Sequence, residues 1–203
     1  KANVDFTALT DEPDSGYMLD TLIGKAEETR QAMIKTAEKL SDYETIITFD
    51  PADAKIFLRE YKEWGIEVNA TVKTFTSYVN GLIKEGRLKP VKSDEVFTFQ
   101  DPAHLARDLE ETEEAREILE ACGKVSEMLV HGKDTNWAGN LLMYEYMPEV
   151  IEKAARIRWE DAAHSKADTL VTASPSEYEV LKKVKPRDMK LLNIEDVVLL
   201  SCR

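Results

Sequence analysis

One helix-start signature occurs twice in the chain, each time directly after a short apolar run. Each copy has a polar cap residue, then a proline, then an acid three residues after the cap. These residues are Asp50, Pro51 and Asp53 in the first copy and Ser174, Pro175 and Glu177 in the second. A polar cap accepts a hydrogen bond from a free backbone N–H, and proline suits the first helical position. Both segments therefore predict a buried strand that leads into an α-helix.

A turn of small residues precedes each helix start at almost the same distance. The glycines of these turns, Gly16 and Gly139, lie 34 residues before Asp50 and 35 residues before Ser174. Two matching landmarks at nearly one spacing indicate an internal duplication. We therefore predict that the chain contains two copies of one α/β unit.

Strands and helices are expected to alternate along the whole chain. Predicted strands span 4–9, 45–49, 70–75, 96–99, 125–130 and 169–173. Predicted helices span 19–40, 51–64, 77–84, 105–121, 141–166 and 177–184, and Pro148 should start a new segment or kink its helix. This alternation is typical of parallel sheets with right-handed crossovers. The predicted fold is two tandem Rossmann-like α/β units with mainly parallel sheets, related by internal duplication.

Turn signals and basic residues are densest at 87–94, which predicts the junction between the halves. The first half then covers 1–90 and the second 91–203. We expect the first half to lack its opening strand and helix, and the chain to be a fragment of a longer polypeptide.

Five short segments carry a resemblance to a known family. They are Asp14-Ser15-Gly16, Asp50-Pro51-Ala52-Asp53, Asp101-Pro102-Ala103-His104, Trp137-Ala138-Gly139 and Ser174-Pro175-Ser176-Glu177. Their order resembles the duplicated cysteine-rich (CCG) domain of heterodisulfide reductase. The same domain occurs in the iron–sulfur subunits of glycolate oxidase, lactate-utilisation enzymes and anaerobic glycerol-3-phosphate dehydrogenase. In that family Cys-Cys-Gly, Cys-Pro-x-Cys and Asp-Pro-Cys-His stand at these places, and the thiolates hold iron–sulfur clusters.

The resemblance spans residues 4–184 and implies an oxidoreductase or electron-transfer context, but the ligand cysteines are replaced. The replaced positions are Asp14, Ser15, Asp50, Asp53, Ala103, Trp137, Ala138, Ser174 and Glu177. Iron–sulfur clusters need thiolate ligands, so we expect no cofactor in this fragment. The two cysteines, Cys122 and Cys202, lie at none of these positions and fit free thiols in a reducing cytoplasm.

The replaced positions allow two interpretations. They can be plain helix caps, because Asp and Ser satisfy free N–H groups. Alternatively, if the fold is kept, Asp14, Asp50 and Asp53 converge and form an oxygen site for Mg²⁺, Ca²⁺ or Mn²⁺. In the second half we expect Trp137 to be largely buried near Ala103 and Pro175, in the space that a cluster would occupy. No catalytic residue is predicted, since Walker, G-x-G-x-x-G and G-x-S-x-G motifs are absent.

Charge and composition narrow the choice of partners. The net charge of −12 disfavours nucleic acid and anionic membranes. No segment reaches the roughly 20 apolar residues of a membrane span, so we expect a cytoplasmic protein without direct membrane insertion.

Three functional hypotheses follow from these patterns. The first is a scaffold or redox-partner interaction module that has lost its clusters and belongs to a redox complex. The second is part of an oxidoreductase subunit whose cofactors lie outside this fragment and whose cleft here helps to bind substrate. The third is a divalent-metal or small-ligand binding domain.

Overall fold

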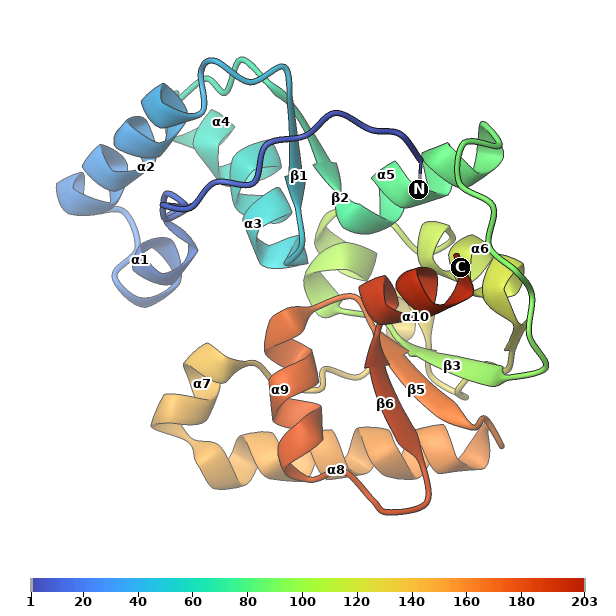
Figure 1. The fold of residues 1–203 in the computed structure, drawn as a ribbon. Coiled ribbons are helices and arrows are strands. Elements are labelled where there is room, and N and C mark those ends of the chain that lie inside the picture. The colour runs from blue at the N-terminus through green and yellow to red at the C-terminus, as the bar shows by residue number, and fades with distance from the viewer. Residues whose placement is uncertain (1, 203) are drawn as a thin grey trace. The chain divides into compact units, whose positions relative to one another are not determined.

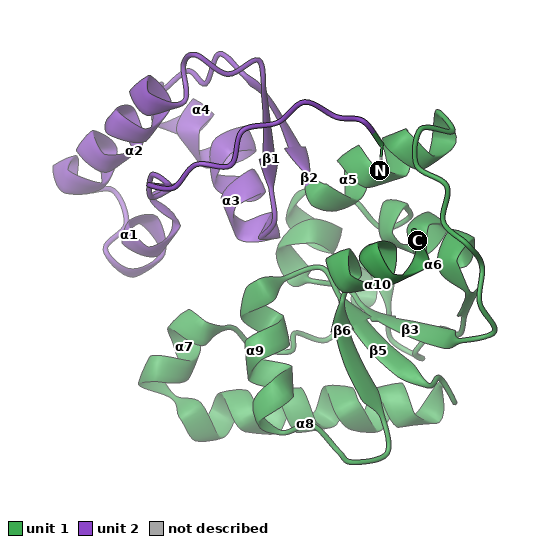
Figure 2. Ribbon diagram, viewed as in Figure 1, with its two compact units in different colours: residues 1–2, 75–203 green, residues 3–74 purple. Residues whose placement is uncertain are grey.

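The computed structural model describes residues 2–202 and shows helices alternating with parallel strands (Figure 1). Contacts divide the chain into two compact units (Figure 2). The smaller unit spans Asn3–Thr74, and the larger unit comprises the chain from Phe75 onward together with Ala2. The boundary between the units lies before the predicted junction at 87–94. The reason is that the helix Phe75–Lys84 packs against the helix Glu114–Cys122 and so belongs to the larger unit.

The smaller unit is a two-stranded parallel sheet with helices. Its elements are α1 (Tyr17–Leu22), α2 (Glu27–Lys39), β1 (Thr45–Thr48), α3 (Pro51–Lys55), the π-helical turn η1 (Ile56–Glu60), α4 (Tyr61–Glu63) and β2 (Thr71–Thr74). Thr45 of β1 lies opposite Thr71 of β2. The core joins α2 to the α3–α4 segment through buried Met33, Ile56 and Tyr61. Apolar packing therefore fixes the helices next to the segment that Asp50 caps.

The larger unit has a four-stranded parallel sheet. Its elements are α5 (Phe75–Lys84), β3 (Val96–Gln100), η2 (His104–Asp108), α6 (Glu114–Cys122), β4 (Lys124–Val125), η3 (Gly132–Asp134), α7 (Leu141–Tyr146), α8 (Pro148–His164), β5 (Thr169–Thr172), α9 (Pro175–Lys183), β6 (Lys190–Asn193) and α10 (Ile194–Ser201). Figure 1 shows α8 and α9 on one side of this sheet and α6 and α10 on the other. Both faces are covered, which explains why every residue of β5 is buried.

The strand order of the larger sheet is β4-β3-β5-β6. The chain moves from β3 to β4 in one direction and from β5 to β6 in the other, so the order reverses between β3 and β5. Ligands of open α/β sheets bind beyond the carboxyl ends of the strands at such a point. The segments after Gln100 and after Thr172 lie there, and both carry positions singled out by the sequence.

The predicted fold class is confirmed: the protein is α/β and all of its described strand pairs are parallel. Pro148 starts α8 as a new segment, as one of the two expected outcomes. The order of elements after Gly16 (short helix, longer helix, strand, proline-started helix, strand, helix) is the same as the order after Gly139. Descent of the two halves from one duplicated unit stays a prediction.

Several predicted elements were wrong in detail. Residues 4–9 form no strand, because no neighbouring strand pairs with them. The helix expected at 19–40 is broken by Gly24, whose φ of 75° ends α1. The helix expected at 105–121 is interrupted before α6, where Glu110 has a φ of 58°. The strand expected at 125–130 is reduced to β4 (Lys124–Val125).

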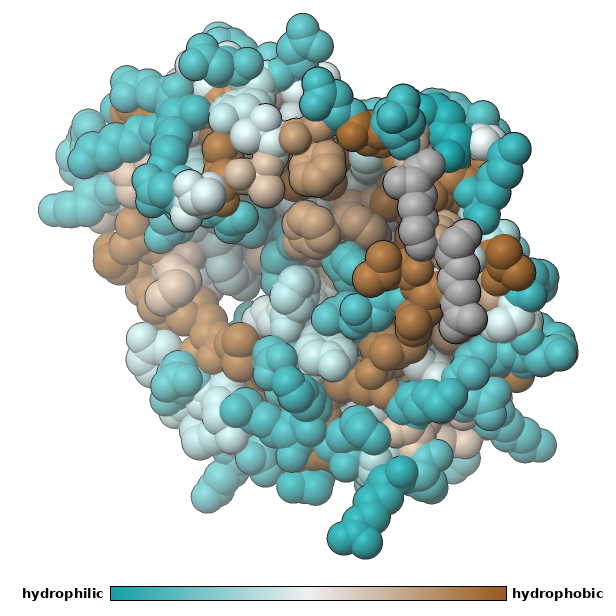
Figure 3. Space-filling view, in the orientation of Figure 1, coloured by the Kyte–Doolittle hydropathy of each residue, from teal (hydrophilic) through white to brown (hydrophobic). Residues whose placement is uncertain are grey.

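Hydrophilic residues cover most of the face shown in Figure 3, with apolar patches between them. Within residues 2–202, no helix combines the length and the apolar character that crossing a bilayer requires.

Candidate functional site

Two glycine turns place the first family positions against a long helix. Gly16 has a φ of 90° and Gly139 a φ of 98°, a conformation that side-chain-bearing residues rarely adopt. A Cβ atom on Gly139 would lie 2.4 Å from Ile151 Cγ2 in α8, and one on Gly16 would lie 2.9 Å from Met33 Cγ in α2. Only glycine allows this close approach, so the turns hold the preceding residues beside the helix.

The positions of the first half are brought together by hydrogen bonds. The buried Ser15 donates from Oγ to Asp53 Oδ1 at 2.6 Å. Asp14 accepts from the backbone N–H of Gly16 at 2.8 Å, and Asp50 caps α3 by accepting from that of Ala52 at 3.0 Å. Asp50 therefore acts as the helix cap that the sequence predicts, and the Ser15–Asp53 bond ties the glycine turn to α3.

Carboxylates crowd around Asp53. Burial raises the pKa of Asp53 above its usual value, the hydrogen bond from Ser15 opposes this, and the negative charges of Asp50 and Asp14 raise it further. Asp50 and Asp14 are thus close enough to Asp53 to influence its carboxyl group. Even so, within residues 2–202 no group of three or more His, Cys, Asp or Glu residues is arranged to hold a metal ion. The oxygen site at Asp14, Asp50 and Asp53 stays a prediction.

In the second half, the Gln100 side chain links three segments beyond the strand ends. Its Nε2 donates to Asp101 O at 3.1 Å, to Asn136 O at 3.2 Å and to Glu177 Oε2 at 3.2 Å. Ser174 caps α9 by accepting from the backbone N–H of Glu177 at 3.3 Å. The segments that contain Ala103, Trp137–Ala138 and Ser174–Glu177 therefore meet at the carboxyl ends of β3 and β5.

The prediction for Trp137 was wrong. Its side chain is 37% exposed, although the next residue, Ala138, is fully buried. Pro175, expected to lie near it, is itself exposed. The interior beside Glu177 is instead occupied by two polar side chains, Gln100 and Arg158, both 0% exposed.

Arg158 projects from α8 into this interior. Its Nε donates to Gln100 Oε1 at 2.5 Å and its Nη1 contacts Asp161 Oδ2 at 2.8 Å. Burial lowers the pKa of Arg158 from its usual value, and the charges of Asp161 and Glu177 oppose that effect. A buried guanidinium is tolerated only when it is paired, so Asp161, Gln100 and Glu177 form one polar network with it.

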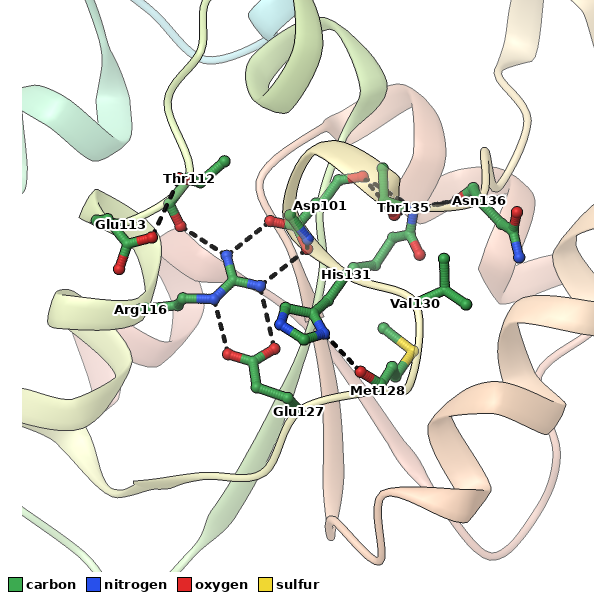
Figure 4. A network of polar contacts seen from close by, with 12 residues as sticks. Asp101, Thr112, Glu113, Arg116, Glu127, Met128, Val130, His131, Thr135 and Asn136 are labelled. Atoms are coloured by element: carbon green, nitrogen blue, oxygen red, sulfur yellow. Dashed lines mark hydrogen bonds and ion pairs between the residues drawn. The ribbon is translucent and has the colours of Figure 1, made fainter.

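A second network holds Asp101 at the end of β3 (Figure 4). The carboxylate is 1% exposed and forms two bonds with Arg116, at 2.7 and 3.0 Å. It also accepts from the backbone N–H of Gly132 at 2.8 Å. Arg116 in turn contacts both carboxylate oxygens of Glu127, at 2.7 and 3.0 Å. Figure 4 shows the guanidinium between the two carboxylates.

The two carboxylates explain how Arg116 keeps its charge. Burial acts to lower the pKa of Arg116, but the hydrogen bonds to Asp101 and Glu127 outweigh burial and raise it. The guanidinium also lies 5.7 Å from the centre of the Phe99 ring, within cation–π range. From the sequence, Asp101 was noted only as the first residue of the Asp101-Pro102-Ala103-His104 segment.

No sequence pattern pointed to the partners Arg116, Glu127 and Arg158. Gln100 offered one weak signal, as a polar residue directly after the apolar strand predicted at 96–99.

Comparison with known proteins identifies a relative by sequence. No protein-family model matches the chain. The chain is 34% identical over 96 residues to the "Probable iron-sulfur-binding oxidoreductase FadF" of Bacillus subtilis (strain 168). That match covers 47% of this chain and 13% of the relative, so the chain corresponds to a small part of the relative's length.

Similar solved structures include the aspartate racemase of Picrophilus torridus and an arylmalonate decarboxylase. The racemase matches with a TM-score of 0.39 and 10% sequence identity, and the alignment covers 94% of this chain and 75% of the racemase chain. The decarboxylase matches with a TM-score of 0.28 and 11% sequence identity, and the alignment covers 88% of this chain and 77% of the decarboxylase chain. Both TM-scores are too low to support an argument about function. The sequence match, over about half of the chain, relates this protein to iron–sulfur-binding oxidoreductases.

Proposed function

We propose that the chain is a module of an iron–sulfur oxidoreductase system that keeps the framework of the cysteine-rich domain, binds no cluster, and acts as a scaffold or redox-partner interaction domain. One observation carries the proposal. The polar residues at the family's ligand positions hydrogen-bond to other groups of the protein, as Ser15 does to Asp53 and Glu177 does to Gln100. They stabilise the two strand-end regions themselves.

The donor chemistry does not fit an iron–sulfur cluster. Clusters are held by thiolates, four for the common types, and the nine family positions carry none. Cys122 ends α6 just before β4, and its carbonyl accepts from Ser93 N, just before β3. It therefore lies at the amino ends of the strands, whereas the candidate site lies at their carboxyl ends. Cys122 and Cys202 are both buried.

The buried networks explain how the fold survives without a cluster. In the family the cluster ties three segments together at the strand ends. Here the Gln100 amide joins the same segments, and the Arg158 guanidinium holds Gln100 in place by donating to its Oε1. We place the module in a cytoplasmic redox complex with protein partners, and the net charge of −12 argues against nucleic acid as a partner.

The test is anaerobic reconstitution. The purified chain is incubated with ferrous iron, sulfide and a thiol reductant, desalted, and examined for visible absorption, iron and acid-labile sulfide. We expect a colourless protein with neither element bound in stoichiometric amount. The Bacillus subtilis relative, treated in parallel, controls for the procedure because its name describes iron–sulfur binding. A brown chain with stoichiometric iron and sulfide would falsify the proposal.

A second candidate rests on the coverage of the relative. The match spans 13% of that protein. If this chain is likewise part of a longer polypeptide, the cofactors lie in the remainder, and the strand-end region of this chain helps to bind substrate. In that case, exchanging Asp101 or Glu177 in the longer protein raises KM for the substrate without changing its cluster content. The scaffold proposal instead expects lower stability and an unchanged KM.

A further inference from the structure

Strand β1 lies at an unpaired edge of the smaller sheet. The order of this sheet is β1-β2 (Figure 2), and within residues 2–202 no strand runs along the other side of β1. Residues of a parallel strand direct their N–H and C=O groups alternately to its two sides. Thr71 N of β2 accepts Glu44 O as its partner at 2.9 Å, donating to it, so Thr45 and Ile47 direct their groups to the unpaired side. These groups form a template for one more parallel strand.

The residue types of β1 are those of an interior strand. Every other edge strand of the two described sheets carries a lysine, which is Lys73 in β2, Lys124 in β4 and Lys190 in β6. Charges of this kind protect a sheet edge from pairing with another chain. Strand β1 (Thr-Ile-Ile-Thr) carries no charge, and neither do the interior strands β3 and β5. β1 is therefore an edge strand by its pairing but an interior strand by its sequence.

Strand β5 shows what pairs with such a strand. β1 and β5 each follow a glycine turn and two helices, precede a capped helix that begins with proline, and pair in parallel with the next strand. The other side of β5 is occupied by β3, which pairs Phe97–Gln100 with Thr169–Thr172. All residues of β5 are buried, whereas in β1 only Thr48 is buried and Thr45 is exposed. The unpaired side of β1 thus corresponds to the side of β5 that β3 covers.

We propose that the unpaired side of β1 binds an extended, uncharged strand of a partner protein, which adds to the sheet in parallel. This inference rests on the proposed interaction role and specifies the kind of partner. Strand addition draws its affinity from main-chain hydrogen bonds and its specificity from alternate side chains. The sequence of β3, Val-Phe-Thr-Phe-Gln, shows the chemistry that fits, which is β-branched and aromatic residues without charge.

A second copy of the chain is a poor source of this strand. β3 and β5 are paired along both sides, and the outer strands β2, β4 and β6 carry the lysines described above. The strand-like segment 4–9 has the charged Asp5 as its second residue. A second copy would also add another charge of −12, and like charges oppose association. These features favour a separate protein as the donor of the strand.

A peptide with the β3 sequence tests the site. The peptide is Glu-Val-Phe-Thr-Phe-Gln-Lys-Lys, which is residues 95–100 followed by two lysines for solubility. It is added to the isotope-labelled full chain, and amide hydrogen exchange is followed by NMR. With the peptide at about ten times its Kd, exchange of the Thr45 and Ile47 amides should slow about tenfold. The amides of Ile46 and Thr48 face β2 and should change little, so the expected signature is an alternation along β1.

A second peptide controls for charge. It has proline in place of the threonine, so it keeps the charge of the first peptide but lacks a central N–H, and it should bind at least about tenfold more weakly. This comparison separates strand addition from attraction between the lysines of the peptide and the acidic chain.

Variants of the chain test the edge itself. Thr45→Pro removes an N–H on the unpaired side at the first residue of β1, where a strand tolerates proline. It should weaken binding about fivefold or more, whereas the matched control Thr45→Ser keeps the N–H and should bind like the parent. Ile47→Lys places on β1 the charge that the other edge strands carry and should weaken binding as well. Thermal unfolding of each variant checks that it is folded, and Ile47→Lys keeps the test decisive if Thr45→Pro does not fold.

Several outcomes overturn the proposal. It fails if the β3 peptide does not bind, if the proline peptide binds equally well, or if Thr45→Pro and Ile47→Lys both bind like the parent. It also fails if the Thr45 and Ile47 amides are already protected without peptide. Such protection in a sedimenting dimer identifies a second copy as the donor, and in a monomer it identifies residues of the same chain. None of these outcomes depends on iron or sulfide content, so the reconstitution experiment tests the proposed function separately.

Discussion

Removal of the Asp101 carboxylate tests what holds the end of β3. Asp101 is 1% exposed and accepts hydrogen bonds from Arg116 Nη1, Arg116 Nη2 and Gly132 N at 2.7, 3.0 and 2.8 Å. Asp101→Ala leaves a buried guanidinium partly unpaired and an N–H without its partner. Breaking a buried ion pair costs about 3–5 kcal/mol. Because Arg116 keeps Glu127, we expect the lower end, about 3 kcal/mol.

The size of the effect should depend on what replaces the carboxylate. Asp101→Asn keeps the shape and one acceptor oxygen, so it should cost about 1–2 kcal/mol. For a chain of this size, a loss of about 3 kcal/mol lowers the Tm by roughly 6–12 °C. Thermal and urea unfolding followed by circular dichroism measure both variants.

The control variant is Asp94→Ala. It removes the same charge from an exposed pair with Lys124 and should melt like the parent, because exposed pairs are screened by water. If Asp101→Ala and Asp94→Ala melt alike, the network in Figure 4 is not what holds the strand end.

Two further perturbations test the smaller unit and the glycine turn. Burial and neighbouring carboxylates raise the pKa of Asp53, so its contribution to stability is full below the unfolded pKa and is lost as pH rises through the folded pKa. As pH falls from 7 to 4, the Tm of the parent should therefore rise relative to the Tm of Asp53→Asn. A constant difference between the two Tm values across that range would contradict a raised pKa for Asp53. Gly139→Ala should destabilise by about 2–4 kcal/mol, since it adds left-handed strain and a clash with Ile151. Gly86→Ala, at a φ of 69° in open space, should cost only about 1 kcal/mol, and equal losses for both variants would refute the close-approach argument.

The sequence predicted those features that local physics decides. Asp50 and Ser174 cap their helices as expected, because capping involves atoms two or three residues apart. Strand β5 was also predicted, because a short continuous apolar run is typical of a strand that is buried on both faces of a parallel sheet. The fold class follows from the alternation of such segments.

Features set by distant partners were not predictable from these patterns. Gln100 meets Arg158, 58 residues along the chain, and no local pattern links the two. Trp137 was expected inside because its size suits a cavity, but the polar network already fills that interior. Strand β6 (Lys190–Asn193) was missed because it is short and only its second residue is buried.

The parallel topology also affects how the two sheets form during synthesis. In the smaller unit Thr45 pairs with Thr71, 26 residues later, whereas in the larger unit Phe97 pairs with Thr169, 72 residues later. Translation at about 5–20 residues per second makes the second interval roughly 4–14 s. During that time the edge of β3 that later meets β5 has no partner. The smaller sheet can therefore close on the ribosome well before the larger one, whereas the nascent larger unit keeps an unpaired strand edge for longer.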